Sequence, residues 1–501
     1  MHKNLFLVGC VGLAGLVLVY LFDSIRFAFI YNVLPLFFVS GIIFRLQKQK
    51  VPVNFILMGI LGISLILHAY QFRTTPSWPG GDSGDYLMYG NRFARGEGLR
   101  GLYYWPPLYP FFAGLCLKIC RGSEDFIFMV QHFLLWLALP LIYSICDKLK
   151  FSNSVGLCAC ALFTLNSLCM QMAQTVMSEI LYLFLVLLCI WIILKFNEEI
   201  SYKYAVICAL IFALASHCRQ LLNPLFCFFL FCIFLINGKK AIPKIVTALL
   251  VFLLCMVPWS IRNKKHFNHF GISANLGINI FTKLTAFKLQ NENAEGFKDI
   301  KGVFNNVLKD LDLEWYKVPE IPQADWQVNK IPHNLFDSLI QYHGHSITSA
   351  DRLLTGIALK GFLGRPIDYL KAVMRTFNDM IFRMHGIFPK PQSVFPFLSG
   401  RIKINPVISR ILRGFVYIPG WFLFFYIPVF LAGKKYDVAK LLPLIVCLYA
   451  YGLNAAVQIG FTRYGVPWIP FLTICSSYVL YYFYVLISGK TASFIEHCSG
   501  K

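Results

Sequence analysis

The sequence predicts an all-α polytopic membrane protein with about twelve transmembrane helices. Of its 501 residues, 57% are hydrophobic and 16% aromatic, while only 14% are charged. Soluble domains carry about 25% charged residues. The apolar residues also gather into runs close to the roughly 20 residues that a helix needs to cross a bilayer. A chain that crosses the membrane many times accounts for all of these observations.

The apolar runs place the spans near 4–22, 27–44, 52–70, 124–146, 154–173, 179–195, 203–217, 222–236, 242–259, 412–432, 438–456 and 465–487. The Leu7–Cys10 segment loosely resembles a lipoprotein cleavage site. Cleavage there would leave too few residues before the cut for a signal peptide, so we interpret the first run as a retained span. A segment at 111–120 is too short to span and is expected to lie in the membrane interface.

Basic residues set the direction of the spans, because Lys and Arg concentrate in cytoplasmic loops. Basic clusters follow the second, fourth, eighth and tenth runs, at 45–50, 148–150, 239–244 and 434–435. Both termini are then cytoplasmic, and 71–123 and 262–411 lie on the other side. We therefore expect four parts: a transmembrane hairpin at 1–50, a core at 51–261 with its outer loop at 71–123, an outer cap at 262–411, and C-terminal helices at 412–501.

The net charge of +22 does not indicate a nucleic-acid partner. Lys and Arg stand mainly in short loops beside apolar runs, where they set topology and meet anionic lipid headgroups. The 16 cysteines lie almost entirely within apolar runs, so we interpret them as small buried side chains. No Cys-x-x-Cys pair or zinc spacing appears.

Two aspartates, Asp82 and Asp85, stand in the polar loop that follows the third run. Their i, i+3 spacing places them on one face if a helix begins at Asp82. They are then candidates for a general base and a residue that positions a hydroxyl or a cation. The alternative is a helix cap, in which Asp82 accepts helix N–H bonds and Asp85 favours the positive end of the helix dipole.

Glu179 opens an apolar run in which 180–194 carries no charge. An acid at the edge of a span is costly unless it is paired or does chemistry, although a first-turn glutamate can also reach water. Arg219, Arg262 and Arg463 stand at span ends on the same outer side. Guanidinium groups suit bidentate phosphate binding, and the alternative is contact with lipid headgroups.

The outer histidines, His266, His269, His343 and His345, match no standard metal spacing. A divalent metal held by Glu179 with a carboxylate or a histidine stays an open possibility. The sequence contains no phosphate-cradling glycine loop, so no nucleotide is expected at the site.

Several short motifs together resemble the family 39 type of membrane glycosyltransferase, whose fold is called GT-C. Protein O-mannosyltransferases and the aminoarabinose transferases that modify lipid A belong to this group. The matching pieces follow the family's order over about 52–487: Gly81-Asp82 to Asp85-Tyr86, Ala94 to Gly98, Pro106 to Pro110, Ser178-Glu179, Arg219, Val257-Pro258-Trp259, Ile261-Arg262-Asn263, Ser273 to Gly277 with Asn279, Asp351-Arg352 to Pro366, and Arg463-Tyr464 with Pro467.

The resemblance implies a GT-C-like bundle with extracytoplasmic juxtamembrane helices and a helical cap. It implies a sugar donor carried on a polyprenyl phosphate and a glycolipid, polysaccharide or protein acceptor, in a bacterial inner membrane with the site outside the cytoplasm. Asp82 then deprotonates the acceptor and the anomeric configuration inverts. Arg262 and Arg463 would offset the phosphate charge, with Arg219 next.

We also expect Tyr86, Asn263 and Tyr464, which neighbour these groups, to contact substrate. The chain departs from the family in two places. Ser83-Gly84 separates the two acids of the loop, and Trp105 precedes Pro106 where lipid A enzymes have an acid and a lysine.

Two other functions remain open from the sequence. One is an O-antigen or capsule polymerase, which has a similar topology. The other is a transporter or flippase of lipid-linked sugars, which would show internal repeats and charges near the middle of the membrane. The charges here stand at span ends and no repeat is visible, so the sequence favours the glycosyltransferase.

Overall fold

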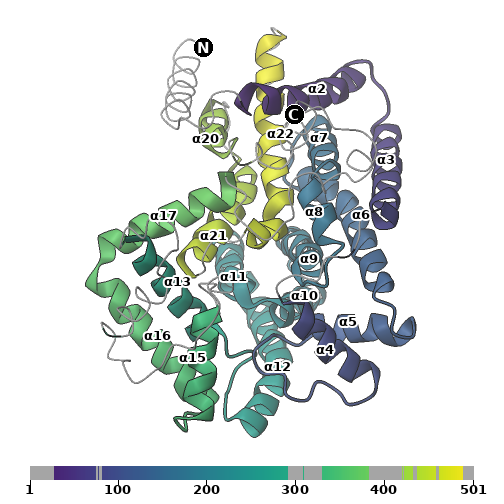
Figure 1. The fold of residues 1–501 in the computed structure, drawn as a ribbon. Coiled ribbons are helices and arrows are strands. Elements are labelled where there is room, and N and C mark those ends of the chain that lie inside the picture. The colour runs from purple at the N-terminus through teal and green to yellow at the C-terminus, as the bar shows by residue number, and fades with distance from the viewer. Residues whose placement is uncertain are drawn as a thin grey trace.

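The computed structural model describes residues 28–74, 77, 82–291, 309, 330–382, 420, 422–432, 437–457 and 462–488. Every regular element in these ranges is an α-helix or a short 3-10 helix, as Figure 1 shows. The prediction of an all-α protein is therefore confirmed for this part of the chain. The predicted first span at 4–22 and the cap segments at 292–308 and 383–411 lie outside the described residues.

The apolar helices form one bundle, in which α9 packs against α6 and α10 while α22 packs against α7. The bundle contains α2 (Ala28–Lys48), α3 (Val53–Thr74), α6 (Asp125–Lys148), α7 (Asn153–Thr164), α8 (Ser167–Met172), α9 (Glu179–Glu198), α10 (Tyr202–Cys218), α11 (Asn223–Asn237), α12 (Ile242–Phe267), α20 (Leu423–Ala432), α21 (Leu442–Val457) and α22 (Ile469–Ile487). Short 3-10 helices join some of them: η1 (Gln220–Leu222), η2 (Gly238–Ala241), η5 (Val438–Leu441) and η6 (Thr462–Trp468).

Six described segments are long and apolar enough to cross a membrane: 53–74, 125–148, 179–198, 220–267, 438–457 and 463–487. The protein is therefore an integral membrane protein. The 220–267 segment contains α11 and α12, which correspond to two predicted spans, whereas α7, α10 and α20 are shorter apolar helices.

The predicted span at 154–173 is not one helix. Helix α7 ends at Thr164 and α8 begins at Ser167. The side chain of Asn166 accepts a hydrogen bond from the backbone N–H of Cys169 and so caps α8. Because asparagine competes for backbone bonds in this way, it ends one helix and starts the next.

Small side chains allow the inner helices to pack closely. Cys158 and Cys160 on α7 and Cys189 on α9 are 0% exposed, and the described cysteines are free thiols. These three positions agree with the interpretation of the cysteines as small buried side chains, whereas Cys227 on α11 is exposed.

Between α3 and α6 the chain forms two amphipathic helices, α4 (Ser83–Ala94) and α5 (Leu108–Ile119), which pack against each other. The contact is close because Gly90 meets Gly114. Predicted segment 111–120 is therefore one side of a helical hairpin. This hairpin fixes the start of α4, where Asp82 stands.

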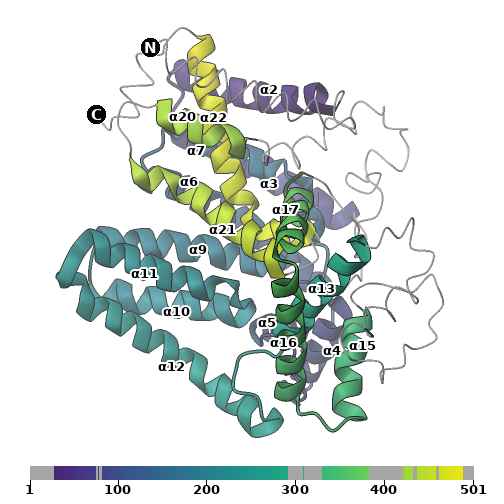
Figure 2. The same cartoon turned by 90° about the vertical axis from the view of Figure 1, so that its left-hand side faces the viewer.

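A second, smaller core belongs to the cap, formed by α13 (Leu276–Asn291), α15 (Lys330–Gln341), α16 (Ile347–Gly364) and α17 (Pro366–Phe382). Phe281, Leu335 and Leu354 are among its buried residues, and Tyr103 and Tyr104 from the segment before α5 pack against it. In Figure 2, α16 and α17 run across the ends of α9, α10 and α11 rather than alongside them. The cap and the α4–α5 hairpin thus enclose the same end of the bundle.

We predict that Gly114→Ala destabilises the protein by about 1–3 kcal/mol, the usual cost of overpacking a close contact. An added Cβ would lie 2.8 Å from the carbonyl oxygen of Gly90 and 2.8 Å from the ring of Phe93. The matched control is Gly62→Ala on α3, where nothing lies within 4 Å. Thermal unfolding of both variants in detergent checks this, and equal melting temperatures would contradict it.

Candidate active site

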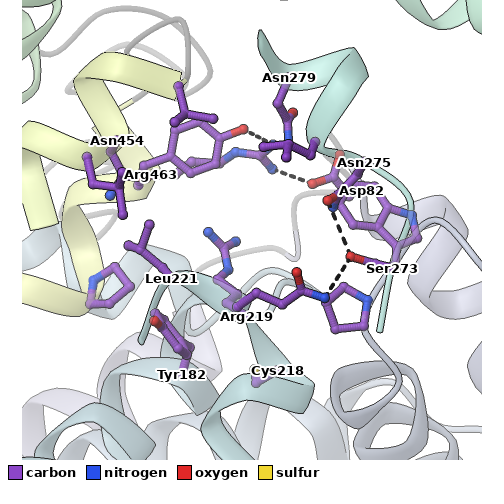
Figure 3. A pocket seen from close by; sticks show the side chains of 18 of the residues that line it. Asp82, Tyr182, Cys218, Arg219, Leu221, Ser273, Asn275, Asn279, Asn454 and Arg463 are labelled. Atoms are coloured by element: carbon purple, nitrogen blue, oxygen red, sulfur yellow. Dashed lines mark hydrogen bonds and ion pairs between the residues drawn. The ribbon is translucent and has the colours of Figure 1, made fainter. Parts of the chain in front are cut away.

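A cavity of about 350 Å³ opens where the α4–α5 hairpin, the cap and the ends of the bundle helices meet. Its lining combines two arginines and one carboxylate with amides, aromatic rings and apolar side chains, as the close-up in Figure 3 shows. The lining residues are Asp82, Tyr86, Tyr104, Trp105, Pro106, Tyr182, Cys218, Arg219, Gln220, Leu221, Pro224, Ser273, Asn275, Leu276, Asn279, Thr282, His333, Leu453, Asn454, Val457, Arg463, Tyr464, Pro467 and Trp468.

Asp82 occupies the N-cap position of α4, but its side chain makes no capping bond. Its Oδ2 atom instead lies 3.0 Å from Nη1 of Arg463, and Figure 3 shows this ion pair within the cavity. The Asp82 side chain is 20% exposed, so one face of the carboxylate remains accessible. The structure thus does not support the helix-cap alternative for this aspartate.

Glu179 begins α9 and is 0% exposed. Its Oε1 atom accepts a hydrogen bond of 2.5 Å from Nη2 of Arg219 and lies 3.9 Å from Nε of Arg463. Arg219 also donates from Nε to the hydroxyl of Ser178, at 2.9 Å. The acid does not reach water. It balances the charge of Arg219, which is partly buried, and of Arg463, which is buried and stands about 240 residues later in the chain.

The segment before Glu179 is held in place by Gln131, a polar residue of α6 that is fully buried. Its Nε2 donates to the carbonyl oxygens of Ala173, at 3.1 Å, and Thr175, at 2.8 Å, while Oε1 accepts from the hydroxyl of Tyr109, at 3.0 Å. The ring of Tyr109 packs edge-on against Tyr86, with centroids 4.7 Å apart. Gln131 was not predicted, although a lone glutamine in an apolar span was a visible signal.

Two tyrosines bring aromatic surface to the charged groups. Tyr86 is buried, and this burial holds the pKa of its hydroxyl well above the usual value. The nearby Asp82 carboxylate raises the pKa further, so the hydroxyl stays a neutral hydrogen-bonding group. Tyr464 accepts a hydrogen bond from Arg463 at 3.2 Å, and the Arg219 guanidinium lies 5.6 Å from its ring centroid. Both tyrosines line the cavity.

Asp85 lies one turn after Asp82 but is exposed and is not among the cavity-lining residues. Its Oδ2 accepts a hydrogen bond of 3.2 Å from the indole of Trp105. The structure therefore separates the two predicted aspartates, because the turn of α4 directs them to different surroundings. Asp85 thus contacts Trp105, which lines the cavity, but does not itself line it.

Arg262 and Asn263, which we expected to bind substrate, do not line the cavity. Arg262 donates to the carbonyl oxygens of Leu99, at 2.6 Å, and Leu102. Asn263 is fully buried and donates to the carbonyls of Gly271, at 2.7 Å, and Ile272, at 3.1 Å. Both side chains tie the C-terminal end of α12 to neighbouring loops. Both residues stand at a span end, as Arg219 does, but their side chains donate hydrogen bonds to backbone carbonyl oxygens and do not face the cavity.

The cap contributes lining residues that were not predicted as a site. His333 on α15 lies 3.3 Å from the hydroxyl of Tyr104, and burial lowers the pKa of its imidazole against the opposing pull of Asp82. Ser273, Asn275 and Asn279 add uncharged polar groups along the same side, as Figure 3 shows for these three. A histidine in a long polar stretch carries no local signal that would have singled it out.

The described residues contain no group of three or more His, Cys, Asp or Glu side chains placed to hold a metal ion. Two of the outer histidines have other partners. His269 contacts the carbonyl of Ser273, at 3.1 Å, and His345 contacts the hydroxyl of Ser349, at 3.1 Å. The Oε1 atom of Glu179, the residue we considered for a metal, is bonded by Arg219.

Residues 105–261 match the family model described as dolichyl-phosphate-mannose-protein mannosyltransferase. This stretch begins at Trp105 in the cavity wall, contains Glu179 and Arg219, and ends within α12. No curated protein sequence matches the chain.

Among solved structures, the chain is similar to the archaeal oligosaccharyltransferase AglB from Archaeoglobus fulgidus, solved in complex with an inhibitory peptide and a dolichol-phosphate. The TM-score is 0.46 and the sequence identity 14%, over 90% of this chain and 52% of that chain. The chain thus spans about half the length of that protein.

The helical membrane bundle thus carries a charged cavity, and part of the wall of this cavity lies within the residues that match the family model. The resemblance to the protein mannosyltransferase type that the sequence predicted is confirmed over residues 105–261. This match favours the glycosyltransferase over the transporter alternative.

We predict that Glu179→Gln lowers the free energy of unfolding by about 3 kcal/mol, because removing one partner of a buried ion pair leaves an uncompensated charge. The matched control is Glu198→Gln at the other end of α9. Glu198 pairs with Lys148 at 3.0 Å but is 44% exposed, so its loss should cost less than about 1 kcal/mol. Denaturation of both variants in detergent measures the difference, and similar losses would contradict a special role for the buried pair.

Proposed function

We propose that the protein transfers a sugar from a polyprenyl phosphate donor to a hydroxyl of an acceptor, with Asp82 as the base and inversion at the anomeric carbon. The observation that carries the proposal is the cavity in which one partly accessible carboxylate and two arginines meet. The description of the matched family, a dolichyl-phosphate-mannose-protein mannosyltransferase, supports a lipid phosphate donor.

Arg219 and Arg463 are the groups that suit the phosphate. Both line the cavity, and without a ligand their two charges are balanced by Asp82 and Glu179. Glu179 is fully buried and stays with the arginines, whereas Asp82 is 20% exposed and faces the cavity. An arriving phosphate can therefore replace Asp82 as the partner of Arg463, which leaves the carboxylate beside the acceptor.

In the reaction, the acceptor oxygen forms a bond to the anomeric carbon while the bond from that carbon to the phosphate oxygen breaks. The electron pair of the broken bond leaves with the phosphate, and the hydroxyl proton passes to Asp82. Negative charge thus grows on the phosphate beside Arg219 and Arg463, where fixed cations stabilise the transition state more than the ground state. Attack from the side opposite the phosphate inverts the configuration.

We propose an extracytoplasmic site in a bacterial inner membrane, because the lysines of the short connections between bundle helices lie at the opposite end of the bundle. Helices α6 and α9 run between the two ends: Glu179 lies at the cavity, while Lys148 pairs with Glu198 at the far end. Lys239 and Lys240 lie in η2, at the same far end of α11. Lysine-rich ends are typically cytoplasmic. An envelope glycolipid, polysaccharide or protein is the acceptor class that such a site serves.

Asp82→Asn is predicted to lower kcat by about 10²–10⁴-fold, the usual contribution of a general base. The assay is sugar transfer from synthetic polyprenyl phosphate sugars in proteoliposomes, with elution and melting profiles to verify folding. Asp85→Asn serves as the control and should keep most of its activity, because this carboxylate lies outside the cavity lining. Turnover of Asp82→Asn close to that of the unsubstituted protein would remove Asp82 as the base.

Arg219→Gln should weaken binding of polyprenyl phosphate about 10- to 100-fold, since hydrogen bonds to charged groups contribute roughly 1.5–3 kcal/mol. Binding to the purified protein can be measured by calorimetry in detergent. Arg262→Gln is the control, because its guanidinium binds loop carbonyls outside the cavity. If the Arg262 variant loses affinity and the Arg219 variant does not, the phosphate lies elsewhere.

A further inference from the structure

Helices α16 and α17 meet at a corner, residues 359–374, which we call the elbow. Five large apolar side chains of the elbow face away from the protein. Their exposed fractions are Leu359 49%, Leu363 78%, Ile367 69%, Leu370 60% and Met374 59%. On a membrane protein, exposed apolar side chains of this kind face lipid or a partner.

The exposed residues form one stripe on each helix. Leu359 and Leu363 are four residues apart on α16, and Ile367, Leu370 and Met374 follow at helical spacing on α17. The opposite faces are buried in the protein: Leu354, Ala358 and Phe362 on α16, and Ala372, Thr376 and Met380 on α17. Each helix thus has two apolar faces. One face is buried, against the cap helices for α16 and mainly against α21 for α17, and the other face is exposed.

The corner is held in shape by aromatic stacking. The rings of Phe362 and Tyr369 are stacked with centroids 4.0 Å apart, one from each side of the corner. The hydroxyl of Tyr369 donates to the carbonyl oxygen of Ala456, at 2.8 Å. Ala456 stands near the end of α21, two residues after the cavity-lining Asn454. The elbow is therefore fixed at the level where a membrane-crossing helix ends beside the cavity.

The orientation and position of the two helices fit a membrane surface. Figure 2 shows α16 and α17 running across the direction of α9, α10 and α11. In Figure 1 the corner between them forms the outer edge of the molecule, beside the bundle rather than over it. Nothing within the described chain covers the stripe.

Basic side chains surround the stripe. Lys360, Arg365, Lys371 and Arg375 are exposed, while the elbow contains one acid, Asp368, which lies 3.4 Å from Lys371. An exposed apolar face flanked by Lys and Arg is the pattern of a helix that lies in the interface of an anionic bilayer. Two copies of such an elbow would place like charges against each other, which disfavours self-association through this face.

We propose that the elbow inserts its apolar stripe into the leaflet on the cavity side of the membrane, with its basic side chains on anionic headgroups. The cap is then attached to the bilayer at its outer edge, and α15, which carries His333 into the cavity, is held at a fixed height above the lipid. This proposal does not depend on the transfer reaction or on the identity of the donor.

Nitroxide labels at Leu363→Cys and Ile367→Cys test the position of the elbow in vesicles that contain phosphatidylglycerol. We expect relaxation by oxygen, which dissolves in the bilayer, to exceed relaxation by a water-soluble nickel chelate at both sites. The ratio should be at least about threefold higher than at a control label on the cap, as the interfacial depth implies. Unsubstituted protein taken through the same labelling gives the background from its own cysteines.

Tyr342→Cys provides the control, because Tyr342 is 79% exposed but stands among polar residues in the turn between α15 and α16. Nickel relaxation at 363 and 367 equal to that at 342 would show that the elbow faces water and would overturn the proposal. Spin–spin broadening that grows with protein density in the vesicles would show a second copy on the stripe, which would overturn it as well.

Discussion

The site depends on one buried arrangement of charge, in which Glu179 holds Arg219 and approaches Arg463 while Arg463 pairs with Asp82. Burial of ionised groups is strongly unfavourable unless each has a partner, so these four side chains stabilise one another only as a set. They come from α4, the start of α9, the end of α10 and η6. The charge requirement therefore fixes four distant parts of the chain at one point.

The uncharged polar groups around this set are as important as the charges, because they determine where the backbone lies. Gln131 satisfies two carbonyls of the segment before Glu179, and Ser178 accepts a bond from Arg219. In a membrane, backbone groups outside a helix need such partners, since lipid offers none. The turn between α8 and α9 is thus possible because Gln131 replaces the water that a soluble protein would use.

The sequence predicted the helical membrane architecture and the charged residues that meet at the cavity. A charged residue at the end of an apolar run has a high free-energy cost in a membrane, so an acid or an arginine at such a position stands out in the sequence. The sequence does not distinguish Arg219 from Arg262, which also stands at a span end. The two arginines differ in their hydrogen-bond partners. Arg262 donates to the carbonyls of Leu99 and Leu102, which stand about 160 residues earlier in the chain. Asp85 was equally ambiguous, since the direction of a side chain one turn along α4 depends on how α5 packs. The break at Asn166 rests on a local capping bond that the apolar pattern of the run conceals, whereas the entry of His333 into the cavity follows from long-range packing that local patterns do not contain.

The hydrogen bonds of Arg262 have a consequence for how the cap is attached to the rest of the protein. They join α12 to the stretch before α5, and the backbone N–H of Ala274, just before α13, donates to the carbonyl of Tyr103 in that same stretch, at 3.0 Å. The stretch before α5 is thereby hydrogen-bonded both to the end of α12 and to the start of the cap. The cap therefore cannot swing away from the α4–α5 hairpin as a hinged lid without breaking this connection.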